Sequence, residues 1–306
     1  MDNIIKTDNI IKHYGKVHAL DGVSLFIKKG EIYGFLGLNG AGKTTTILIL
    51  LGIIRPTSGT AYLFGKRVSA RDSGQWNKVG YLVDRSHSYP ELTVFENLEI
   101  IRRLRNVPDI KSVNNIIDRL QLLPYKEMKA KNLSLGNAQR LALAKALLHN
   151  PDILILDEPA NGLDPAGIVE IREMLMGLAA NQEITIFISS HILGEISKLA
   201  TRIGIIHKGK LIQEVNVPEL NALRQKRLLF DVHDKKAAQS KLNENGFLVT
   251  LTKEGLLEIK DDKAINHPEY IANLLVYAGL PPTMLKVTEE DLESYFLRTV
   301  GINGGI

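Results

Sequence analysis

One glycine-rich segment, residues 37–44 with the sequence GLNGAGKT, constrains the fold of this 306-residue chain more than any other. Residues 31–36 before it read as a strand, and residues 42–52 read as the helix that follows. In such a strand–loop–helix unit, glycines let the backbone wrap around phosphate groups, and the helix N-terminus offers free N–H groups to an anion. The segment therefore predicts an α/β domain that binds a nucleotide, through Gly37, Leu38, Asn39, Gly40, Ala41, Gly42, Lys43, Thr44 and Thr45.

Two side chains of this loop carry specific expectations. Lys43 should reach the β- and γ-phosphates, and the Thr44 hydroxyl should bind the Mg²⁺ that accompanies ATP. A second segment, which is acidic, fits the same chemistry, because the apolar strand 153–156 ends in Asp157 and Glu158. We expect Asp157 to join the magnesium shell and Glu158 to activate the attacking water.

The rest of the first 215 residues supports an α/β fold with parallel central strands. Residues 184–189 form a second apolar run without alternation, as in a buried strand, and residues 168–180 have helical spacing. Residues 92–148 read as a mostly helical insertion. Residues 4–32 read as shorter, turn-rich antiparallel strands. We expect a nucleotide-binding domain at 1–219.

A second, smaller domain is expected at 220–306, after Val217 and Pro218. Its predicted elements follow the order β-α-β-β-α-β, which is typical of ferredoxin-like α+β folds. They are assigned to strand 228–232, helix 235–243, strands 247–252 and 256–260, helix 268–278, strand 284–287 and a final helix from Glu289. That last helix has an apolar face of Leu292, Tyr295, Phe296 and Val300.

A third motif narrows the class of nucleotide-binding protein. Residues 133–137, LSLGN, lie ahead of the second acidic segment and read as a capped helix start. They resemble the signature sequence of ATP-binding-cassette (ABC) ATPases, normally Leu-Ser-Gly-Gly-Gln. Leu135 and Asn137 depart from that pattern, while Ser134 and Gly136 match it. The resemblance implies that Ser134, Leu135, Gly136 and Asn137 face the γ-phosphate of ATP held by a second copy of the chain.

The same resemblance implies a fold and further site residues. The fold is a P-loop NTPase cassette with a RecA-like parallel core, an antiparallel β subdomain and a helical subdomain. Asp164 belongs to a loop that touches the partner copy. His191 resembles the switch histidine, which contacts the γ-phosphate, and Tyr14 resembles the aromatic that stacks on adenine. Asp84 stands where the family usually has Gln, and it is assigned to Mg²⁺ and to coupling with the membrane subunit.

Several segments resemble a narrower family, the ATPases of bacitracin transport and lantibiotic immunity. They are residues 30–37 (GEIYGFLG), 161–165 (NGLDP), 188–193 (ISSHIL) and 289–296 (EEDLESYF). The family implies a homodimer of ATPase subunits at the cytoplasmic face of the cell membrane. There it drives a separate integral-membrane permease that removes a peptide antibiotic.

Composition bears on the alternatives. The chain has no cysteine, and its net charge of +4 is too small and too scattered to favour nucleic acid. Its apolar runs are far shorter than the roughly 20 residues of a spanning helix, so direct membrane insertion is not expected. Two alternatives stay open. The chain could serve an exporter or importer of an unrelated small molecule, although an importer would be expected to carry Gln at position 84. It could also be a soluble ABC ATPase that acts on nucleic acid or ribosomes.

Overall fold

The computed structural model describes residues 3–69, 73–83, 88–252 and 254–302. The chain divides into two compact units, Met1–Pro218 and Glu219–Ile306. Each unit has its own group of buried apolar side chains, and each is described by itself below.

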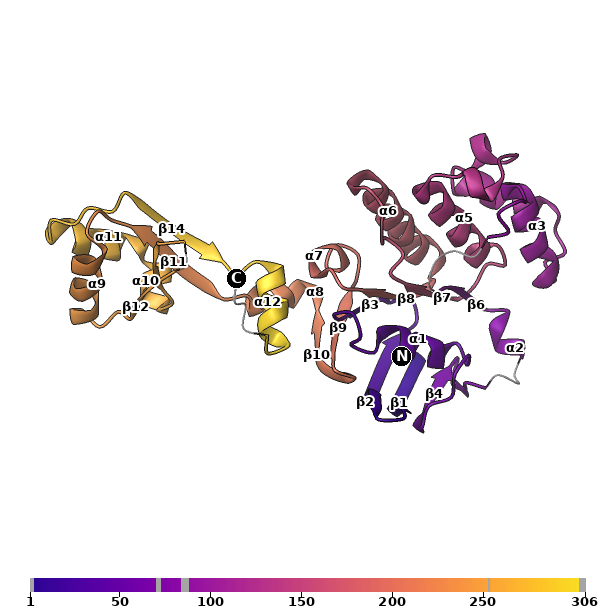
Figure 1. Ribbon diagram of the computed structural model, residues 1–306, viewed down its shortest axis with the longest axis horizontal. Coiled ribbons are helices and arrows are strands. Elements are labelled where there is room, and N and C mark those ends of the chain that lie inside the picture. Colours follow the sequence, from indigo (N-terminus) through magenta and orange to yellow (C-terminus); the bar gives the residue numbers. More distant parts are fainter. Residues whose placement is uncertain (1–2, 70–72, 84–87, 253, 303–306) are drawn as a thin grey trace. The chain divides into compact units, whose positions relative to one another are not determined.

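A mixed sheet of six strands forms the centre of the first unit, in the order β10-β9-β3-β8-β7-β6 (Figure 1). Its strands are β3 (Ile32–Leu36), β6 (Val79–Leu82), β7 (Ile153–Asp157), β8 (Thr185–Ser190), β9 (Arg202–His207) and β10 (Lys210–Asn216). The pairs from β9 through β6 are parallel, and only β10 runs antiparallel to its neighbour. Strands β3 and β7 are buried at every residue, and in β7 this confirms the burial predicted from the apolar run 153–156.

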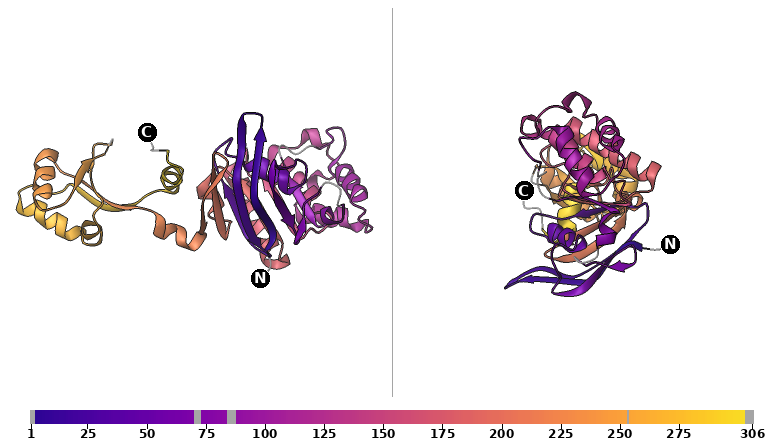
Figure 2. Two further views of the ribbon diagram at one scale, coloured as in Figure 1. Left: turned by 90° about the horizontal axis from the view of Figure 1, so that it is seen from below. Right: turned by 90° about the vertical axis from the view of Figure 1, so that its right-hand side faces the viewer.

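A second sheet of the first unit is antiparallel, in the order β2-β1-β4-β5. Its strands are β1 (Asn3–Tyr14), β2 (Val17–Lys28), β4 (Ser58–Leu63) and β5 (Lys66–Arg67). The expectation of short strands in residues 4–32 is wrong, because β1 and β2 have 12 residues each. The register between β1 and β2 shifts at four points, as at a β-bulge. Each strand continues through these shifts, so the irregular sequence pattern does not end it. Figure 2 shows β1 and β2 side by side as long indigo arrows.

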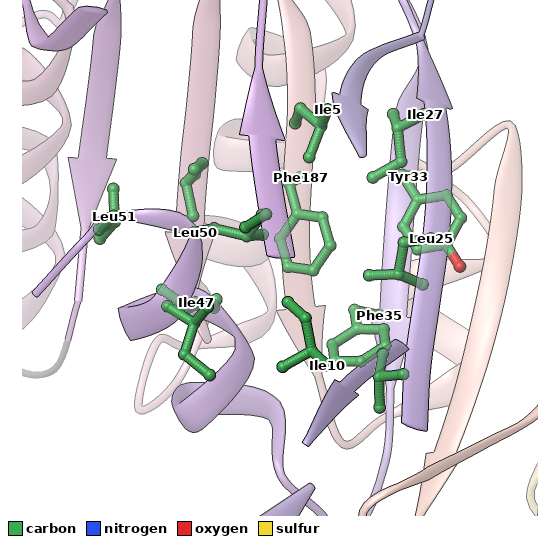
Figure 3. Packing of buried hydrophobic residues seen from close by; sticks show 14 of the residues in the cluster. Ile5, Ile10, Leu25, Ile27, Tyr33, Phe35, Ile47, Leu50, Leu51 and Phe187 are labelled. Carbon is green, nitrogen blue, oxygen red and sulfur yellow. The ribbon is translucent and has the colours of Figure 1, made fainter. Parts of the chain in front are cut away.

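The main core of the first unit lies between these two sheets and includes helix α1 (Lys43–Leu50). Figure 3 shows Phe187 of β8 among aliphatic side chains from the antiparallel sheet and α1. Its ring centroid lies 5.3 Å from that of Phe35 and 5.8 Å from that of Tyr33. This packing fixes β3 and β8 side by side, and both strands lead directly into candidate site residues.

The remaining helices of the first unit include the predicted helical insertion between β6 and β7. Their bounds are α2 (Ser73–Trp76), α3 (Val94–Leu104), α4 (Lys111–Arg119), α5 (Leu135–Leu147), α6 (Pro165–Gln182) and α7 (Leu193–Ile196), with 3₁₀ turns at Leu123–Tyr125 and Ala130–Asn132. Thr93 and Glu96 form a capping box that starts α3. The parallel core, the antiparallel sheet and the helical insertion confirm the predicted fold class.

The second unit confirms the ferredoxin-like prediction. Helix α8 (Val217–Leu223) contains the boundary between the units. The elements after it are β11 (Lys226–Asp231), α9 (Lys235–Glu244), β12 (Val249–Leu251), β13 (Leu257–Ile259), α10 (Asp262–Asn266), α11 (Pro268–Tyr277), β14 (Met284–Glu289) and α12 (Leu292–Thr299). The four strands form one antiparallel sheet in the order β12-β13-β11-β14. That order is the one a split βαβ unit produces.

The predicted start of the last helix is wrong. Glu289 still belongs to β14, where it pairs with Lys226, and α12 begins only at Leu292. Asp291 is the reason, because its side chain accepts a hydrogen bond from the Ser294 N–H at 2.8 Å and so caps the helix. Tyr295, Phe296 and Val300 of the predicted apolar face are buried. Within the described ranges, no helix is both long enough and apolar enough to span a bilayer.

Candidate functional site

The glycine-rich loop, the two acidic residues and His191 lie at the carboxyl ends of three neighbouring parallel strands, β3, β7 and β8. The Gly37 N–H, just after β3, donates to the carbonyl oxygen of Ser190 at the end of β8 (3.1 Å). Asp157 is paired in register with Ser189 on the other side of β8. Because parallel strands end at one edge of a sheet, residues far apart in sequence converge there, where open α/β sheets bind their ligands.

The glycine-rich loop wraps around the lysine that it was expected to present. Lys43 is buried, and its Nζ donates to the carbonyl oxygens of Gly37 (2.7 Å) and Leu38 (3.3 Å). Gly42 has φ 113°, and a Cβ there would lie 2.7 Å from the carbonyl oxygen of Ala19. Both its conformation and its space therefore exclude a larger residue.

Lys43, Glu158 and His191 form a connected group. Lys43 Nζ lies 3.1 Å from Glu158 Oε1, and the side chains are 6% and 20% exposed. The other carboxylate oxygen, Oε2, hydrogen-bonds with His191 Nδ1. Glu158 also has φ 49°, in the left-handed region that is uncommon for a residue with a side chain. Of the three residues predicted to be catalytic, Glu158 thus contacts both others, although the roles assigned to them stay predictions.

Thr44 and Asp157 are in direct contact, which places both side chains near enough to share one magnesium ion. Thr44 Oγ1 donates to Asp157 Oδ2 at 2.7 Å. The described residues contain no cluster of three or more acidic, histidine or cysteine side chains that could hold a metal by themselves. One carboxylate and one hydroxyl nevertheless fit Mg²⁺, which is usually held by one or two carboxylates together with substrate phosphates.

The signature-like segment lies at the start of α5. Ser134 is its N-cap, and the Asn137 N–H donates to the Ser134 hydroxyl at 3.3 Å. Leu135 is 58% exposed, and a Cβ at Gly136 would come no closer than 3.9 Å to another side chain. Among the described residues, no hydrogen bond or ion pair joins Ser134 to Lys43, Thr44 or Glu158. The segment presents an open helix N-terminus that, in the part of the chain described, makes no such contact with the glycine-rich loop of the same chain.

Three other expected residues were assigned by resemblance alone. Asp164 caps α6 by accepting a hydrogen bond from the Gly167 N–H at 2.9 Å. Tyr14 is 49% exposed at the end of β1, with Lys12 Nζ 4.8 Å from its ring centroid. Asp84 lies outside the described residues.

Sequence reasoning missed the role of Ser189. Its fully buried hydroxyl donates to Asp157 Oδ1 and accepts a hydrogen bond from the Glu158 N–H at 3.0 Å. The available signal was a polar residue at the end of an otherwise apolar strand, where a hydroxyl needs a buried partner.

Comparisons with known proteins identify the family of the chain. The family described as "ABC transporter" matches residues 20–161. The bacitracin transport ATP-binding protein BcrA of Enterococcus faecalis is 40% identical over 100% of this chain and 99% of that protein. This chain belongs to the ABC transporter family. As an ABC ATP-binding cassette, it is an ATPase whose hydrolysis of ATP is coupled to transport.

Other similarities cover about 70% of the chain. The lantibiotic transport ATP-binding protein SrtF of Streptococcus pyogenes is 38% identical over 69% of this chain and 90% of that protein. Among solved structures, the dimeric post-hydrolysis state of the ATP-binding cassette MJ0796 bound to ADP and Pi is 26% identical. The structural match covers 70% of this chain and 98% of the MJ0796 chain, with a TM-score of 0.64.

Proposed function

We propose that this chain is the ATP-hydrolysing subunit of an exporter that removes a peptide antibiotic of the bacitracin or lantibiotic type. Two copies would act at the cytoplasmic face of the cell membrane on a separate integral-membrane permease. The observation that carries the proposal is the 40% identity to a bacitracin transport protein over 100% of the chain. That similarity extends through residues 220–306, which we assign as an accessory domain beside the nucleotide-binding domain 1–219.

Within one copy, the proposed chemistry divides among the connected side chains. Lys43 would bind the β- and γ-phosphates, and Glu158 would orient and polarise the attacking water. His191, in contact with Glu158, would hold that carboxylate in place and contact the γ-phosphate. Thr44 and Asp157 would hold Mg²⁺, which supplies charge neutralisation at the phosphates. Asp84 is proposed as a further contact to the metal.

The site is proposed to be completed by a second copy. Ser134 and Gly136 offer an open helix start, and such a terminus attracts a phosphate. Because no hydrogen bond or ion pair among the described residues joins Ser134 to Lys43, we assign the segment to the ATP bound by the facing copy. The loop that contains Asp164 would contact that copy as well. MJ0796, which covers 70% of this chain, was solved as a dimer and supports this arrangement.

ATP binding would close the pair and hydrolysis would release it, because the γ-phosphate makes contacts in the closed pair that ADP lacks. Such a difference in affinity between two states is what any switch requires. The movement would then be passed to the permease.

The test is antibiotic tolerance in cells that express the chain together with its membrane partner. Tolerance of bacitracin or of a lantibiotic should rise, and Glu158→Gln should remove the gain at equal protein level. Tolerance of an antibiotic with an intracellular target serves as the control and should not change. If tolerance of the peptide antibiotics does not rise, and a different compound stimulates ATP hydrolysis, the exporter has an unrelated substrate. Salt-dependent binding to nucleic acid would favour the non-transport alternative.

A further inference from the structure

The end of strand β8 holds a hydroxyl that contacts both acidic residues of the site. Ser189 is fully buried between two neighbouring strands, paired in register with Phe35 of β3 and Asp157 of β7. A buried hydroxyl has one proton to donate and lone pairs to accept with, and Ser189 uses both capacities. It donates to Asp157 Oδ1 and accepts from the Glu158 N–H (3.0 Å).

The bond to Asp157 fixes the direction of that carboxylate. With Oδ1 occupied by Ser189, the opposite oxygen Oδ2 is the one that faces Thr44 Oγ1, at 2.7 Å. The carboxylate would otherwise turn about its terminal torsion, which is broad for an Asp side chain. Ser189 therefore fixes the plane of the Asp157 carboxylate, so that one of its oxygens is held toward Thr44 and the proposed magnesium site.

The bond from Glu158 acts on the backbone. Glu158 has φ 49°, a conformation that costs energy for a residue with a Cβ and persists only where its surroundings enforce it. Ser189 supplies a partner to the N–H of that residue, so the turn that follows β7 is tied to β8. The same turn directs the Glu158 side chain to Lys43 and His191.

We infer that Ser189 is a positioning residue that sets the metal-facing carboxylate and the water-activating carboxylate together. Its hydroxyl contacts Asp157 and Glu158, and it acts through these two residues. This inference rests on the proposed function, because it assumes that those two residues hold Mg²⁺ and activate water. It goes further by assigning to one hydroxyl the alignment of both.

The test compares Ser189→Ala with two other variants of the full-length chain. Thr185→Val is the matched control, since Thr185 is a fully buried hydroxyl on the same strand whose partner is the Gly30 N–H (2.9 Å). Ser189→Thr keeps the hydroxyl and should restore the wild-type behaviour. The first readout is the affinity for a fluorescent ATP analogue, measured in EDTA and across a Mg²⁺ titration. The second is kcat for ATP hydrolysis.

In Ser189→Ala, the half-saturating Mg²⁺ concentration should rise about 10- to 100-fold, as is usual when a partner that orients a metal ligand is lost. Affinity in EDTA should stay within about two-fold of wild type, because Lys43 and the loop are untouched, and kcat should fall. Thr185→Val should keep the wild-type magnesium curve. A Ser189→Ala protein with the wild-type magnesium curve would overturn the inference, whatever its kcat.

Asp157→Asn separates this inference from the proposed function. If Asp157→Asn shifts the magnesium curve and Ser189→Ala does not, only the role of Ser189 is refuted. If neither shifts it, the proposed metal site itself fails. Should Ser189→Ala not fold, Ser189→Cys takes its place, since a thiol fits a similar space but donates and accepts weakly. It is then expected to show the same shift, and a wild-type curve for it counts against the inference.

Discussion

Lys43 Nζ and Glu158 Oε1 lie 3.1 Å apart, so the cation proposed to bind phosphate is paired with the carboxylate proposed to activate water. A γ-phosphate that reaches Lys43 competes with Glu158 for the same ammonium group. Binding of ATP would therefore weaken this ion pair and free Glu158 to contact water. The pair links the binding step to the chemical step through a single charge.

Lys43→Ala should lower the affinity for Mg-ATP roughly 10- to 100-fold, the range expected for the loss of a hydrogen-bonded charge contact. Fluorescence titration with an ATP analogue measures the effect. Lys29→Ala is the control, because Lys29 forms an exposed ion pair with Glu183 (2.8 Å) away from the loop. Equal affinities for wild type and Lys43→Ala would remove Lys43 from the binding site.

The shared site predicts complementation between two inactive chains. In a heterodimer of Lys43→Ala with Ser134→Arg, both lesions fall in the same composite site, and the other site is intact. A mixture of the two folded proteins should therefore regain ATP hydrolysis that neither has alone. If no mixing ratio restores activity, either the two copies do not share sites in this way or both sites must be intact.

The loop and the acidic strand end could be predicted because each is local. Residues 37–44 require glycines at fixed positions, and β7 is an unbroken apolar run that ends in two acids. What the sequence could not supply was the pairing of strands. The sequence does not show that Ser189 is in register with Asp157. That long-range pairing is the reason why a serine at the end of a strand contacts both Asp157 and Glu158.

Stopping the chain after residue 219 should leave nucleotide binding intact. Glu219–Ile306 has a core cluster of its own, and every residue that we propose to bind nucleotide precedes it. We expect the affinity for an ATP analogue to stay within about two-fold of the full chain, although coupling to the permease can be lost. A soluble, folded truncation that binds no nucleotide would refute the proposed division of the domains. The melting curve of the truncated protein serves as the control for folding.

His149 predicts a loss of stability at acid pH. Burial, and secondarily the charge of Arg105, lower the pKa of His149 to about 4. Its Nε2 contacts the Val79 carbonyl oxygen at 3.1 Å, while its buried Nδ1 has no hydrogen-bond partner in the described structure. The folded chain therefore resists a proton that the unfolded chain accepts near pH 6.5.

Because the pKa is depressed in the folded state, the contribution of neutral His149 is fully present above pH 6.5 and declines as the pH falls toward 4. Melting temperatures of wild type and His149→Gln should converge as the pH is lowered over this window, since Gln cannot take up a proton. A constant difference between the two proteins from pH 7 to pH 4.5 would contradict the assignment.

Element boundaries marked the other limit of sequence reasoning. The last helix was expected from Glu289, the first of several acidic residues in a row. The backbone pairing of Glu289 with Lys226 extends β14, and Asp291 then caps the helix. Local charge could not show which of the neighbouring acids is the cap.

Glu158→Gln tests the proposed mechanism most directly, because the amide has the shape of the carboxylate but cannot activate water. ATP affinity should equal or exceed that of wild type, since a negative charge beside the phosphates is removed. The steady-state rate of ATP hydrolysis should fall about 10²- to 10⁴-fold, and the ATP-bound dimer should accumulate in size-exclusion chromatography with Mg-ATP. A hydrolysis rate within a few-fold of wild type would contradict the role of Glu158 and, with it, the mechanism built on its contact with Lys43.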